Sequence, residues 1–528
     1  MKDITKVSWI LLSLLLLCSS ALGQWHRFHG NSLNTGVVPG SMGRAGEVTD
    51  LWTFSINTYS NSSPALADLD DDGLLEVVVA ARNEALYALN GEDGSILWSY
   101  SIALGGNSSA PMVGDIQGDQ NLEVVFASDD TLYAFEGESG GLIWSQPINP
   151  ATAASPCLAD LNGDGSNEVI FGEYSQTCAY DGETGSILWT STGQIQSYGS
   201  SVAEDVDNNG TAEVMVLTSE GGDLYFTLVS GLNGSEIWSS QLEIGLGVVL
   251  TSSPAFADIN NDGSPEIISC FGDNDLYVYN PLDGTVIWHE ELPEIETYAS
   301  PVLGDIDGND SLEVIVTSYS AKEMYAYSCL GDLIWTASVN YRPLGTAGIV
   351  DIDGDSALEI IQTSANSDGP YVGSLQIFNA ETGAEEFSRQ FSSMIGASPA
   401  VGDLDGDGYY DFVFGDHDGS ILAFSMVEQG IEPDYSSGSL HLSVDQNPVK
   451  TNCTISFVTS YASYTNVAIY DLSGREVSSL CQEILPAGAH SFTWDAKYSD
   501  GVTAVSGMYI CRVVSEEGVQ SIGLCLLR

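Results

Sequence analysis

Basic residues are scarce in this sequence, and their scarcity excludes several classes of partner. Lysine and arginine together number 13, against 73 aspartates and glutamates, which gives a formal net charge of −60 at pH 7. A surface with this excess of negative charge repels nucleic acid and anionic membranes and attracts cations. We therefore expect no nucleic-acid partner.

Recognisable catalytic motifs are also missing. The six histidines are dispersed, none belongs to a metal-spaced or nucleophile-bearing motif, and no GxSxG, P-loop or HExxH sequence occurs. The sequence therefore predicts that the protein is not an enzyme. Because acidic residues are so numerous, a pair of carboxylates acting on a sugar stays open as an alternative.

Helix signals are few along the whole chain. Apolar runs are short, β-branched or aromatic, and bounded by Gly, Asn, Asp and Ser, which predicts strands and turns. No cysteine stands in a CxxC pattern, although Cys511 and Cys525 flank an expected hairpin and could pair. With 43% hydrophobic residues the chain can bury a large core, so the predicted fold class is all-β.

The N-terminus has the layout of a secretory signal peptide over residues 1–23. Lys2 and Lys6 accompany an apolar stretch from Val7 to Leu17, and Ala21-Leu22-Gly23 supplies a small-residue cleavage site. A lipoprotein signal at Cys18 is disfavoured because Leu17 precedes it. No later run of 18 apolar residues occurs, so no transmembrane segment is expected after cleavage. The protein is predicted to be exported, either secreted or held at the outer membrane or cell surface.

An acidic loop recurs eight times, first as "ADLDDDGLLEVVV" from Ala67 to Val79. Positions 1, 3, 5 and 9 of each loop carry a side-chain oxygen, and 27 of these 32 positions are carboxylates. The positions are Asp68, Asp70, Asp72, Glu76; Asp115, Gln117, Asp119, Glu123; Asp160, Asn162, Asp164, Glu168; Asp205, Asp207, Asn209, Glu213; Asp258, Asn260, Asp262, Glu266; Asp305, Asp307, Asn309, Glu313; Asp351, Asp353, Asp355, Glu359; and Asp403, Asp405, Asp407, Asp411.

A second phrase alternates with these loops, for example "LYALNGEDGSILW". It ends at a large aromatic residue: Trp52, Trp98, Trp144, Trp189, Trp238, Trp288, Trp335 or Phe387. The repeat period of 45 to 53 residues suits a four-stranded propeller blade. We predict an eight-bladed β-propeller over residues 24–426, with an N-terminal strand near 48–54 closing the last blade. A seven-bladed ring is the alternative. The tryptophans are expected to pack between neighbouring blades.

The acidic loops are predicted to bind up to eight Ca²⁺ ions. Calcium prefers six to eight hard oxygens, and a tight turn converges such ligands on one point. Position 6 is glycine in five of the loops, where the turn is expected to need a conformation costly for other residues. An EF-hand is excluded because its glutamate belongs at position 12, whereas here the acid stands at position 9 and a strand follows.

The loop pattern resembles the calcium loops of FG-GAP repeats in the integrin-α N-terminal propeller and of bacterial VCBS-type repeats. The tryptophan phrase is similar to pyrroloquinoline-quinone-like propeller repeats. The resemblance covers about residues 48–426. It implies a calcium-binding propeller, while the quinone-like phrase by itself would imply a dehydrogenase.

The repeat stops after a linker at 427–440, which is rich in Gly, Pro and Ser. Short strands resume over 441–528 and suit an immunoglobulin-like β-sandwich. The phrases Asn447-Pro448, Ile469-Tyr470-Asp471 and Gly507-Met508-Tyr509 resemble the C-terminal sorting domain of type IX secretion cargo and the related immunoglobulin-like module of the flagellar hook-cap family. The resemblance implies delivery to the cell surface through the secretion machinery.

The links on the face opposite the acidic loops are longer and more varied, and they contain tyrosines such as Tyr341 and Tyr371. Variable tyrosine-bearing loops on a rigid scaffold are typical of binding surfaces. The leading hypothesis is a calcium-stabilised, non-catalytic adhesion or recognition module for protein or glycan. The alternatives are a secreted carbohydrate-active enzyme resembling a polysaccharide lyase and a structural surface scaffold.

Overall fold

A computed structural model describes most of the chain, and its described residues form strands and turns without a helix. The described ranges are 37–41, 46–428 and 443–526, apart from gaps at 57, 59, 61, 83–84, 103–108, 129, 150–153, 174–175, 192–199, 221–222, 243–251, 271–274, 293–298, 353–356, 445–448, 451, 460–462, 472–474, 487, 499–501 and 516–517. The predicted signal peptide and most of the predicted linker lie outside them. The all-β prediction is confirmed. In the described part of the chain no helix is long and apolar enough to cross a membrane.

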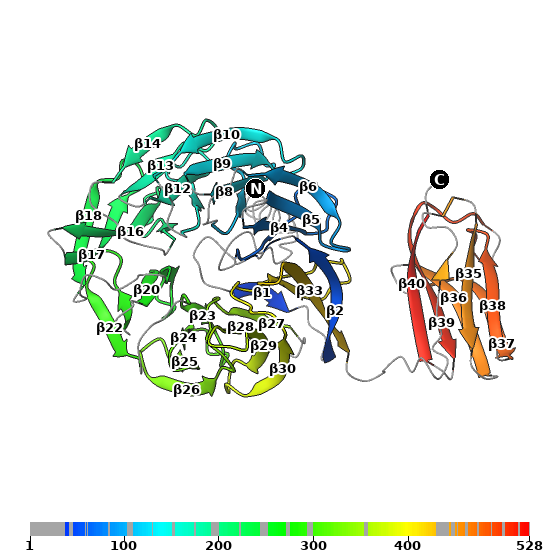
Figure 1. Ribbon diagram of the computed structural model, residues 1–528. Coiled ribbons are helices and arrows are strands. Elements are labelled where there is room, and N and C mark those ends of the chain that lie inside the picture. Colours follow the sequence, from blue (N-terminus) through cyan, green and yellow to red (C-terminus); the bar gives the residue numbers. More distant parts are fainter. Residues whose placement is uncertain are drawn as a thin grey trace, which may run out of the picture. The chain divides into compact units, whose positions relative to one another are not determined.

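The chain divides into two compact units, Met1–Glu428 and Gln429–Arg528. The described residues of the first unit form eight sheets, which Figure 1 shows arranged in a ring. We call these sheets blades 1 to 8 in the order of their acidic loops.

Blades 1 to 4 contain β3 (Ala65–Ala67), β4 (Glu76–Ala81), β5 (Ala85–Asn90), β6 (Ile96–Ser101); β7 (Met112–Gly114), β8 (Glu123–Ser128), β9 (Thr131–Glu136), β10 (Leu142–Pro147); β11 (Cys157–Ala159), β12 (Glu168–Gly172), β13 (Thr177–Tyr180), β14 (Ile187–Thr190); and β15 (Val202–Glu204), β16 (Glu213–Glu220), β17 (Asp223–Ser230), β18 (Glu236–Leu242).

Blades 5 to 8 contain β19 (Ala255–Ala257), β20 (Glu266–Cys270), β21 (Asp275–Tyr279), β22 (Val286–Glu291); β23 (Val302–Gly304), β24 (Glu313–Ser318), β25 (Glu323–Tyr327), β26 (Leu333–Ser338); β27 (Gly348–Asp351), β28 (Glu359–Asn366), β29 (Val372–Asn379), β30 (Glu385–Phe391); and β31 (Ala400–Gly402), β32 (Asp411–Gly415), β33 (Ser420–Glu428), β2 (Gly46–Ser55).

Two strands from the start of the chain join blades that the end of the first unit builds. β2 pairs antiparallel with β33 from Gly46 opposite Glu428 to Ser55 opposite Ser420, and it supplies the fourth strand of blade 8. β1 (Val37–Ser41) pairs parallel with β27 as a fifth strand of blade 7. The first unit therefore closes by antiparallel pairing between sequence-distant strands.

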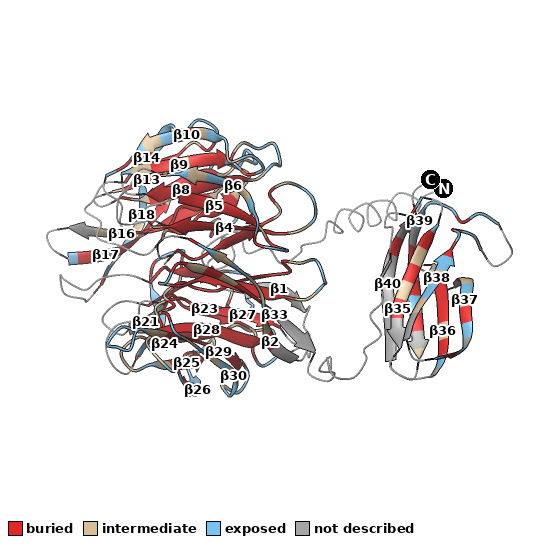
Figure 2. Ribbon diagram, turned by 45° about the vertical axis from the view of Figure 1, so that its right-hand side comes forward, coloured by how far each residue is buried: buried red, intermediate tan, exposed pale blue. Residues whose placement is uncertain are grey.

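Burial follows the strand order within each blade. The second strands are mostly apolar and mostly buried, and every residue of β4 is buried, because neighbouring blades cover both of their faces. The fourth strands lie at the rim in Figure 1 and alternate between exposed and covered residues, as in β6. Figure 2 shows the same change from buried to exposed strands.

The repeated tryptophan joins each blade to the next. In seven interfaces the indole Nε1–H of a fourth strand donates to a carbonyl oxygen in the turn between the third and fourth strands of the following blade, at 2.5 to 2.9 Å. Trp52 of blade 8 donates in this way to Gly91 O of blade 1. The prediction that these rings pack between blades is confirmed.

Two constraints require glycine in the turn between the third and fourth strands of a blade. Gly140 has a φ of +65°, and a Cβ added there would lie 2.6 Å from Cδ2 of Trp98. Glycine alone tolerates both the left-handed backbone and the approach of the indole ring. The Gly and the Trp of the repeated phrase therefore act together across a blade interface.

The eighth interface lacks this bond for a topological reason. Phe387 occupies the position of the tryptophan on β30, opposite Ile377. The third and fourth strands of blade 8 are β33 and β2, which come from opposite ends of the first unit, so no short turn joins them and no turn carbonyl is available. Arg389 instead pairs with Asp50 of β2 at 2.7 Å and lies over the rings of Phe391 and Phe424.

Hydroxyl groups make a second chain of contacts around the ring. In seven of the eight blades the backbone N–H before the first strand donates to a Ser or Thr hydroxyl of the next blade at 2.7 to 3.0 Å, through Ala110, Ser155, Ser200, Ser253, Ser300, Thr346, Ser398 and Ser63. Ala110 has no hydroxyl, and there Ser62 Oγ donates to Ser109 O instead. These bonds satisfy buried backbone donors at the points where blades meet.

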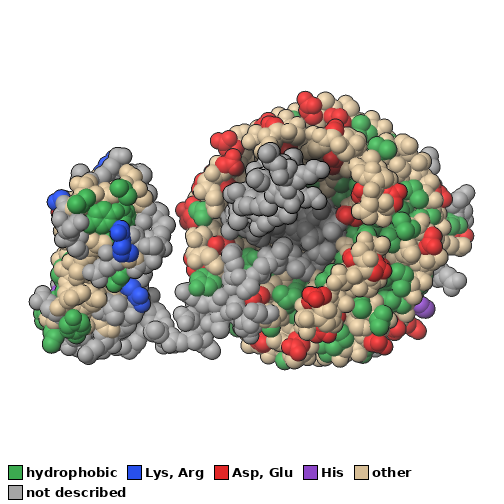
Figure 3. Space-filling model, turned by 180° about the vertical axis from the view of Figure 1, so that it is seen from behind, with side chains coloured by type: hydrophobic (Ala, Val, Ile, Leu, Met, Phe, Trp, Pro, Cys, Tyr) green, Lys and Arg blue, Asp and Glu red, His purple; other side chains and the backbone are tan. Residues whose placement is uncertain are grey.

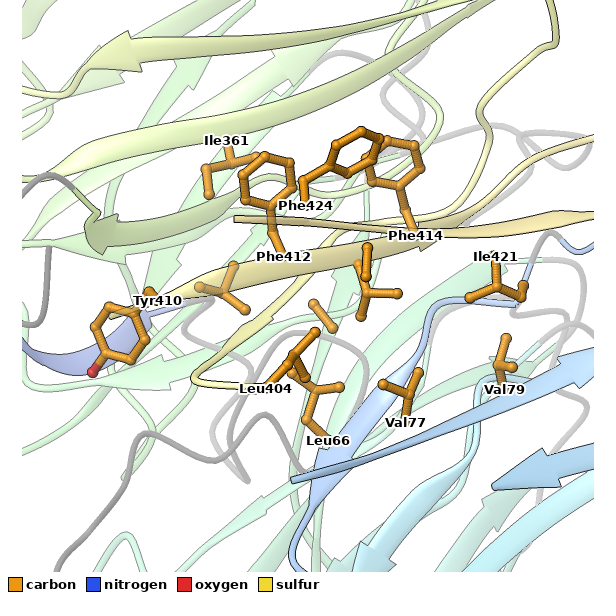
Figure 4. Packing of buried hydrophobic residues seen from close by; sticks show 14 of the residues in the cluster. Leu66, Val77, Val79, Ile361, Leu404, Tyr410, Phe412, Phe414, Ile421 and Phe424 are labelled. Atoms are coloured by element: carbon orange, nitrogen blue, oxygen red, sulfur yellow. The ribbon is translucent and has the colours of Figure 1, made fainter. Parts of the chain in front are cut away.

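Apolar packing completes the closure between the last blades and the first. Figure 4 shows Phe412, Phe414 and Phe424 of blade 8 on the side of Ile361 of blade 7, while Leu404 and Ile421 of blade 8 lie on the side of Leu66, Val77 and Val79 of blade 1. All of these residues belong to one buried cluster. Burying a large apolar side chain contributes about 1.5–3 kcal/mol, so this cluster stabilises the closed ring.

The second unit contains two sheets around one core. The strands are β34 (Ser443–Val444), β35 (Cys453–Thr459) and β38 (Gly488–Trp494) in one sheet, and β37 (Glu476–Leu485), β36 (Ser463–Asp471), β39 (Gly507–Ser515) and β40 (Gly518–Leu526) in the other. Trp494 is fully buried in that core, and its Nε1–H donates to Lys497 O. Cys511 is a buried free thiol, so the suggested pairing with Cys525 is wrong.

We predict that Trp144→Phe destabilises the first unit by about 1–3 kcal/mol, because it removes a donor and leaves the buried Gly182 carbonyl unsatisfied. Urea denaturation followed by tryptophan fluorescence and circular dichroism measures the change. The matched variant Phe387→Trp adds an indole where no turn carbonyl is available to accept its N–H, and we expect no gain in the free energy of unfolding. Stabilisation by Phe387→Trp would contradict this account of the interfaces.

Candidate metal centres

Each acidic loop connects the first strand of a blade to the second. Position 9 is the first residue of the second strand in all eight blades, and its side chain is buried with at most 4% of its surface exposed. Such a carboxyl needs a partner, since burial of an unpaired charge is costly.

The position-9 acid finds that partner within its own loop. One of its oxygens accepts the backbone N–H of position 2 at 2.6 to 3.2 Å in every blade, from Glu76 with Leu69 to Asp411 with Leu404. This hydrogen bond therefore ties the start of the loop to the second strand and does not require a metal ion.

Position 1 serves the same loop from its other end. In the seven loops whose turn is described, one oxygen of this aspartate accepts the N–H of position 6, as Asp68 does from Gly73 at 3.0 Å. Position 6 has a positive φ in all seven, which confirms the reason given for its glycines. Position 4 has a positive φ as well, and there Gly, Asn and Asp occur.

Position 5 is a turn residue in these loops. Its side-chain oxygen accepts the backbone N–H of position 7 at 2.8 to 3.0 Å, as Asp72 does from Leu74. In the four loops described next, the carboxylates that converge are those of positions 1, 3 and 9. That position 5 also contributes to a metal site, as the sequence predicts, stays a prediction.

Four loops bring three carboxylates together. One oxygen from each of positions 1, 3 and 9 lies within 4.8 Å of the other two, a spacing that could hold a metal ion. The groups are Asp68, Asp70, Glu76; Asp205, Asp207, Glu213; Asp305, Asp307, Glu313; and Asp403, Asp405, Asp411. We call these the aspartate-type loops.

Three other loops have an amide at position 3, and that amide donates to the position-9 acid. Asn162 Nδ2 lies 2.7 Å from Glu168 Oε1, Asn260 Nδ2 lies 3.0 Å from Glu266 Oε1, and Gln117 Nε2 lies 3.2 Å from Glu123 Oε1. We call these the amide-type loops. In the remaining loop, Asp353 and Asp355 lie outside the described residues, while Asp351 and Glu359 are buried.

Burial raises the pKa of the position-9 acids. It raises the pKa of Glu76 to about 8 and those of Glu123, Glu168, Glu213, Glu266 and Glu313 to about 7, with the neighbouring carboxylates adding in the same direction. The pKa of Asp411 rises to about 7 for the same first cause. Burial therefore favours the protonated form of these groups, and a bound cation would favour the charged form.

One buried acid outside the repeat was not distinguished by sequence. Glu173, 4% exposed, accepts hydrogen bonds from Tyr180 Oη at 2.9 Å and from the Asn149 and Gln176 side-chain amides at 2.9 and 3.1 Å. All these donors satisfy it as a structural group. Glu296 and Asp273, which share its lack of a repeat position, lie outside the described residues.

The repeats match one family model over more than half of the chain. The model described as outer membrane protein assembly factor BamB matches residues 45–214 and, in an overlapping second match, residues 138–338. The chain belongs to this family. A separate model, the FlgD Ig-like domain, matches residues 447–518 of the second unit. No curated protein matches the chain.

Solved structures share the BamB-type fold at low identity. BamB from Moraxella catarrhalis has a TM-score of 0.51 at 14% identity, covering 72% of this chain and 100% of its own. A europium-containing methanol dehydrogenase has a TM-score of 0.59 at 11% identity, covering 78% and 100%. The quinohemoprotein alcohol dehydrogenase from Comamonas testosteroni has a TM-score of 0.58 at 13% identity, covering 83% and 85%. The β-propeller prediction is confirmed.

The resemblance to FG-GAP and VCBS-type repeats is wrong, because the family match is to BamB-type repeats. The misleading signal was the acidic loop. The side chains at positions 1, 5 and 9 accept backbone N–H groups of a tight turn. An Asx-rich pattern there is therefore explained by the turn geometry and does not by itself identify a family. The family match agrees instead with the tryptophan phrase, which is similar to pyrroloquinoline-quinone-like propeller repeats.

The predicted type IX sorting domain is also wrong, since the family match over residues 447–518 is to the FlgD Ig-like domain. Several residues that carried the resemblance serve the core of the second unit. Ile469 and Tyr509 are buried there, so their presence in the sequence is explained by the packing of the fold and does not indicate a sorting role.

The prediction that the protein is not an enzyme is contradicted as well. Alcohol dehydrogenases share this propeller fold. A propeller can assemble a site from residues of several blades, so the lack of a linear motif does not exclude catalysis.

We predict that the chelated protein loses stability as pH rises from about 4.5 to about 8. The position-9 acids keep their protons in this window when folded and lose them near the ordinary value of 4.5 when unfolded, so rising pH favours the unfolded chain. Thermal midpoints in EDTA at a series of pH values measure the slope.

The variant Glu123→Gln removes one titrating group and keeps an acceptor for the Ile116 N–H, so it should flatten the slope. A midpoint that rises with pH through this window would exclude the explanation.

Proposed function

We propose that the protein is an exported recognition module. It is an eight-bladed, calcium-stabilised propeller followed by an immunoglobulin-like sandwich, and it binds a protein or glycan at the cell surface through the face opposite its acidic loops. Eight sheets in the described part of the first unit support the blade count. The FlgD Ig-like match supports the class of the second unit.

The observation that carries the recognition role is a patch on that opposite face, between blades 6 and 7. It consists of Tyr319, Arg342, Asp368 and Tyr371. The Arg342 guanidinium pairs with Asp368 at 3.0 Å and lies 5.0 Å from the centre of the Tyr319 ring. A β-bridge between Arg342 and Ala365 fixes the backbone. The side chains of Tyr319, Arg342 and Asp368 are therefore in contact with one another in the absence of a ligand.

Tyr371 projects from this patch. Its side chain is 66% exposed, which makes it the most exposed large aromatic in the described part of the first unit. Tyrosine and arginine are enriched where proteins bind partners, because they combine apolar area with hydrogen bonding. A preorganised patch of this kind loses little conformational entropy on binding.

The charge of the first unit and the family match limit the kind of ligand and the location that we propose. In Figure 3 acidic side chains are spread around the ring of the first unit, which disfavours polyanionic ligands. The matched family is described as an outer membrane protein assembly factor, which favours a location outside the cytoplasm and a protein partner.

The dehydrogenase neighbours give a second candidate, alcohol oxidation with a quinone cofactor. Pyrroloquinoline quinone carries several carboxylates and would need cationic partners near the axis of the ring. The first strands, nearest that axis, contain no lysine or arginine in any of the eight blades. These residues do not fit the cofactor, so we derive no catalytic step through it.

Calcium should raise the thermal midpoint of the full chain above its value in EDTA. Each occupied site is expected to contribute about 2.7 kcal/mol when free calcium exceeds the dissociation constant a hundredfold. Differential scanning calorimetry measures the shift, with magnesium as the comparison ion. An unchanged midpoint would refute the calcium part of the proposal.

Tyr371→Ala should abolish capture of the ligand without changing the thermal midpoint, because Tyr371 is exposed and outside the core. Binding of the full chain to a glycan array and to detergent-extracted outer-membrane proteins is the measurement. Leu330→Ala is the matched control, since Leu330 is 74% exposed on the acidic-loop face. Equal binding by both variants would place the recognition surface elsewhere.

A further inference from the structure

The face of blade 7 that packs against blade 6 is polar over part of its length. Ile360 of β28 and Ile315 of β24 belong to the buried cluster between these two blades. Because side chains alternate along a strand, Gln362 and Ser364 lie on the same face of β28 as Ile360. Thr317 likewise shares the face of Ile315 on β24. All three polar side chains are at most 3% exposed.

Glutamine replaces an apolar residue at this place in the fold. Gln362 is the fourth residue of its second strand, and in six of the other seven blades the fourth residue is valine or phenylalanine: Val79, Phe126, Phe171, Val216, Val316 and Phe414. The cross-strand neighbour of Gln362 is a second buried amide, Gln376. Buried polar groups of this kind need hydrogen-bond partners.

The protein itself satisfies part of this polar face. Gln376 Oε1 accepts the Asn340 backbone N–H at 2.7 Å. Gln362 Nε2 donates to the carbonyl oxygens of Gly345 and Thr363 at 3.0 and 2.7 Å. These two carbonyls fix the orientation of the Gln362 amide, because a flipped amide would place its own oxygen against them.

Three buried oxygens have no hydrogen-bond partner within the protein: Gln362 Oε1, Ser364 Oγ and Thr317 Oγ1. They lie at similar depth between the blades, because they belong to the fourth and sixth residues of β28 and the fifth residue of the equivalent strand β24. Residues two apart on a strand are about 7 Å apart, a separation that a molecule with two hydrogen bonds of about 2.8 Å can bridge. An amide oxygen only accepts, whereas a hydroxyl also donates, so the bridging molecule must both donate and accept.

We propose that the interface between blades 6 and 7 holds at least one ordered water molecule, which donates to Gln362 Oε1 and bonds the hydroxyl groups of Ser364 and Thr317. Buried water typically makes about three hydrogen bonds to polar groups that the protein leaves unsatisfied. The site lies next to the recognition patch, since Ser364 directly precedes Ala365, whose backbone pairs with that of Arg342. It depends on neither the proposed calcium ions nor the proposed ligand.

Thermal midpoints of two variants of the full chain test the proposal. Thr317→Val keeps the shape of the side chain and removes one hydroxyl, so the water loses a partner and the midpoint should fall by roughly 1–3 °C. Ser364→Ala should act in the same direction. In a dry interface each variant would instead remove an unsatisfied polar group and raise the midpoint.

A crystal structure of the wild-type chain that resolves ordered water gives the direct measurement, and we expect a water within about 3.2 Å of Gln362 Oε1. Thr363→Val is the matched control. Thr363 lies on the same strand, and its hydroxyl donates to Ala397 O of the link to blade 8 at 2.7 Å, so the water at Gln362 should stay in place. A wild-type structure without this water, or a higher midpoint in Thr317→Val or Ser364→Ala, would overturn the proposal.

Discussion

The bond from each fourth-strand indole to the turn of the next blade is the contact on which the ring depends. It fixes the spacing of neighbouring sheets, requires glycine in the receiving turn, and accounts for the most regular phrase of the sequence. Its direction is the same in all seven interfaces that have it, so every blade except blade 7 gives one such bond and every blade except blade 8 receives one. The exception at Phe387 follows from the same geometry, because blade 8 has no turn to receive it.

The acidic loops combine two roles that the sequence presents as one. Positions 1, 5 and 9 hold backbone N–H groups and shape the turn, which explains why a buried strand begins with a carboxylate in every blade. The loops differ at position 3, where an aspartate brings a third carboxylate close to those of positions 1 and 9 in four loops and an amide donates to the position-9 acid in three others.

Much of the fold could be predicted from the sequence, since the strand pattern, the period and the paired Gly and Trp are local signals with strong steric causes. The acceptor of each indole could not, because Gly91 and Trp52 meet only after the ring closes. The role of each loop residue in the turn could not be predicted, since spacing alone does not show that Asp72 Oδ1 accepts the Leu74 N–H. The family was misassigned for a related reason, because the interpretation gave the oxygen-rich turn more weight than the tryptophan phrase.

The pairing of β2 with β33 has a consequence for how the chain acquires its structure. A polypeptide that emerges N-terminus first presents β2 almost four hundred residues before the partner strand becomes available. Until then its long hydrogen-bonding edge has no native neighbour, and such an edge is open to pairing with other chains. The earliest strand of the ring must wait for the latest, so its edge stays open to pairing with other chains until synthesis of the first unit is complete.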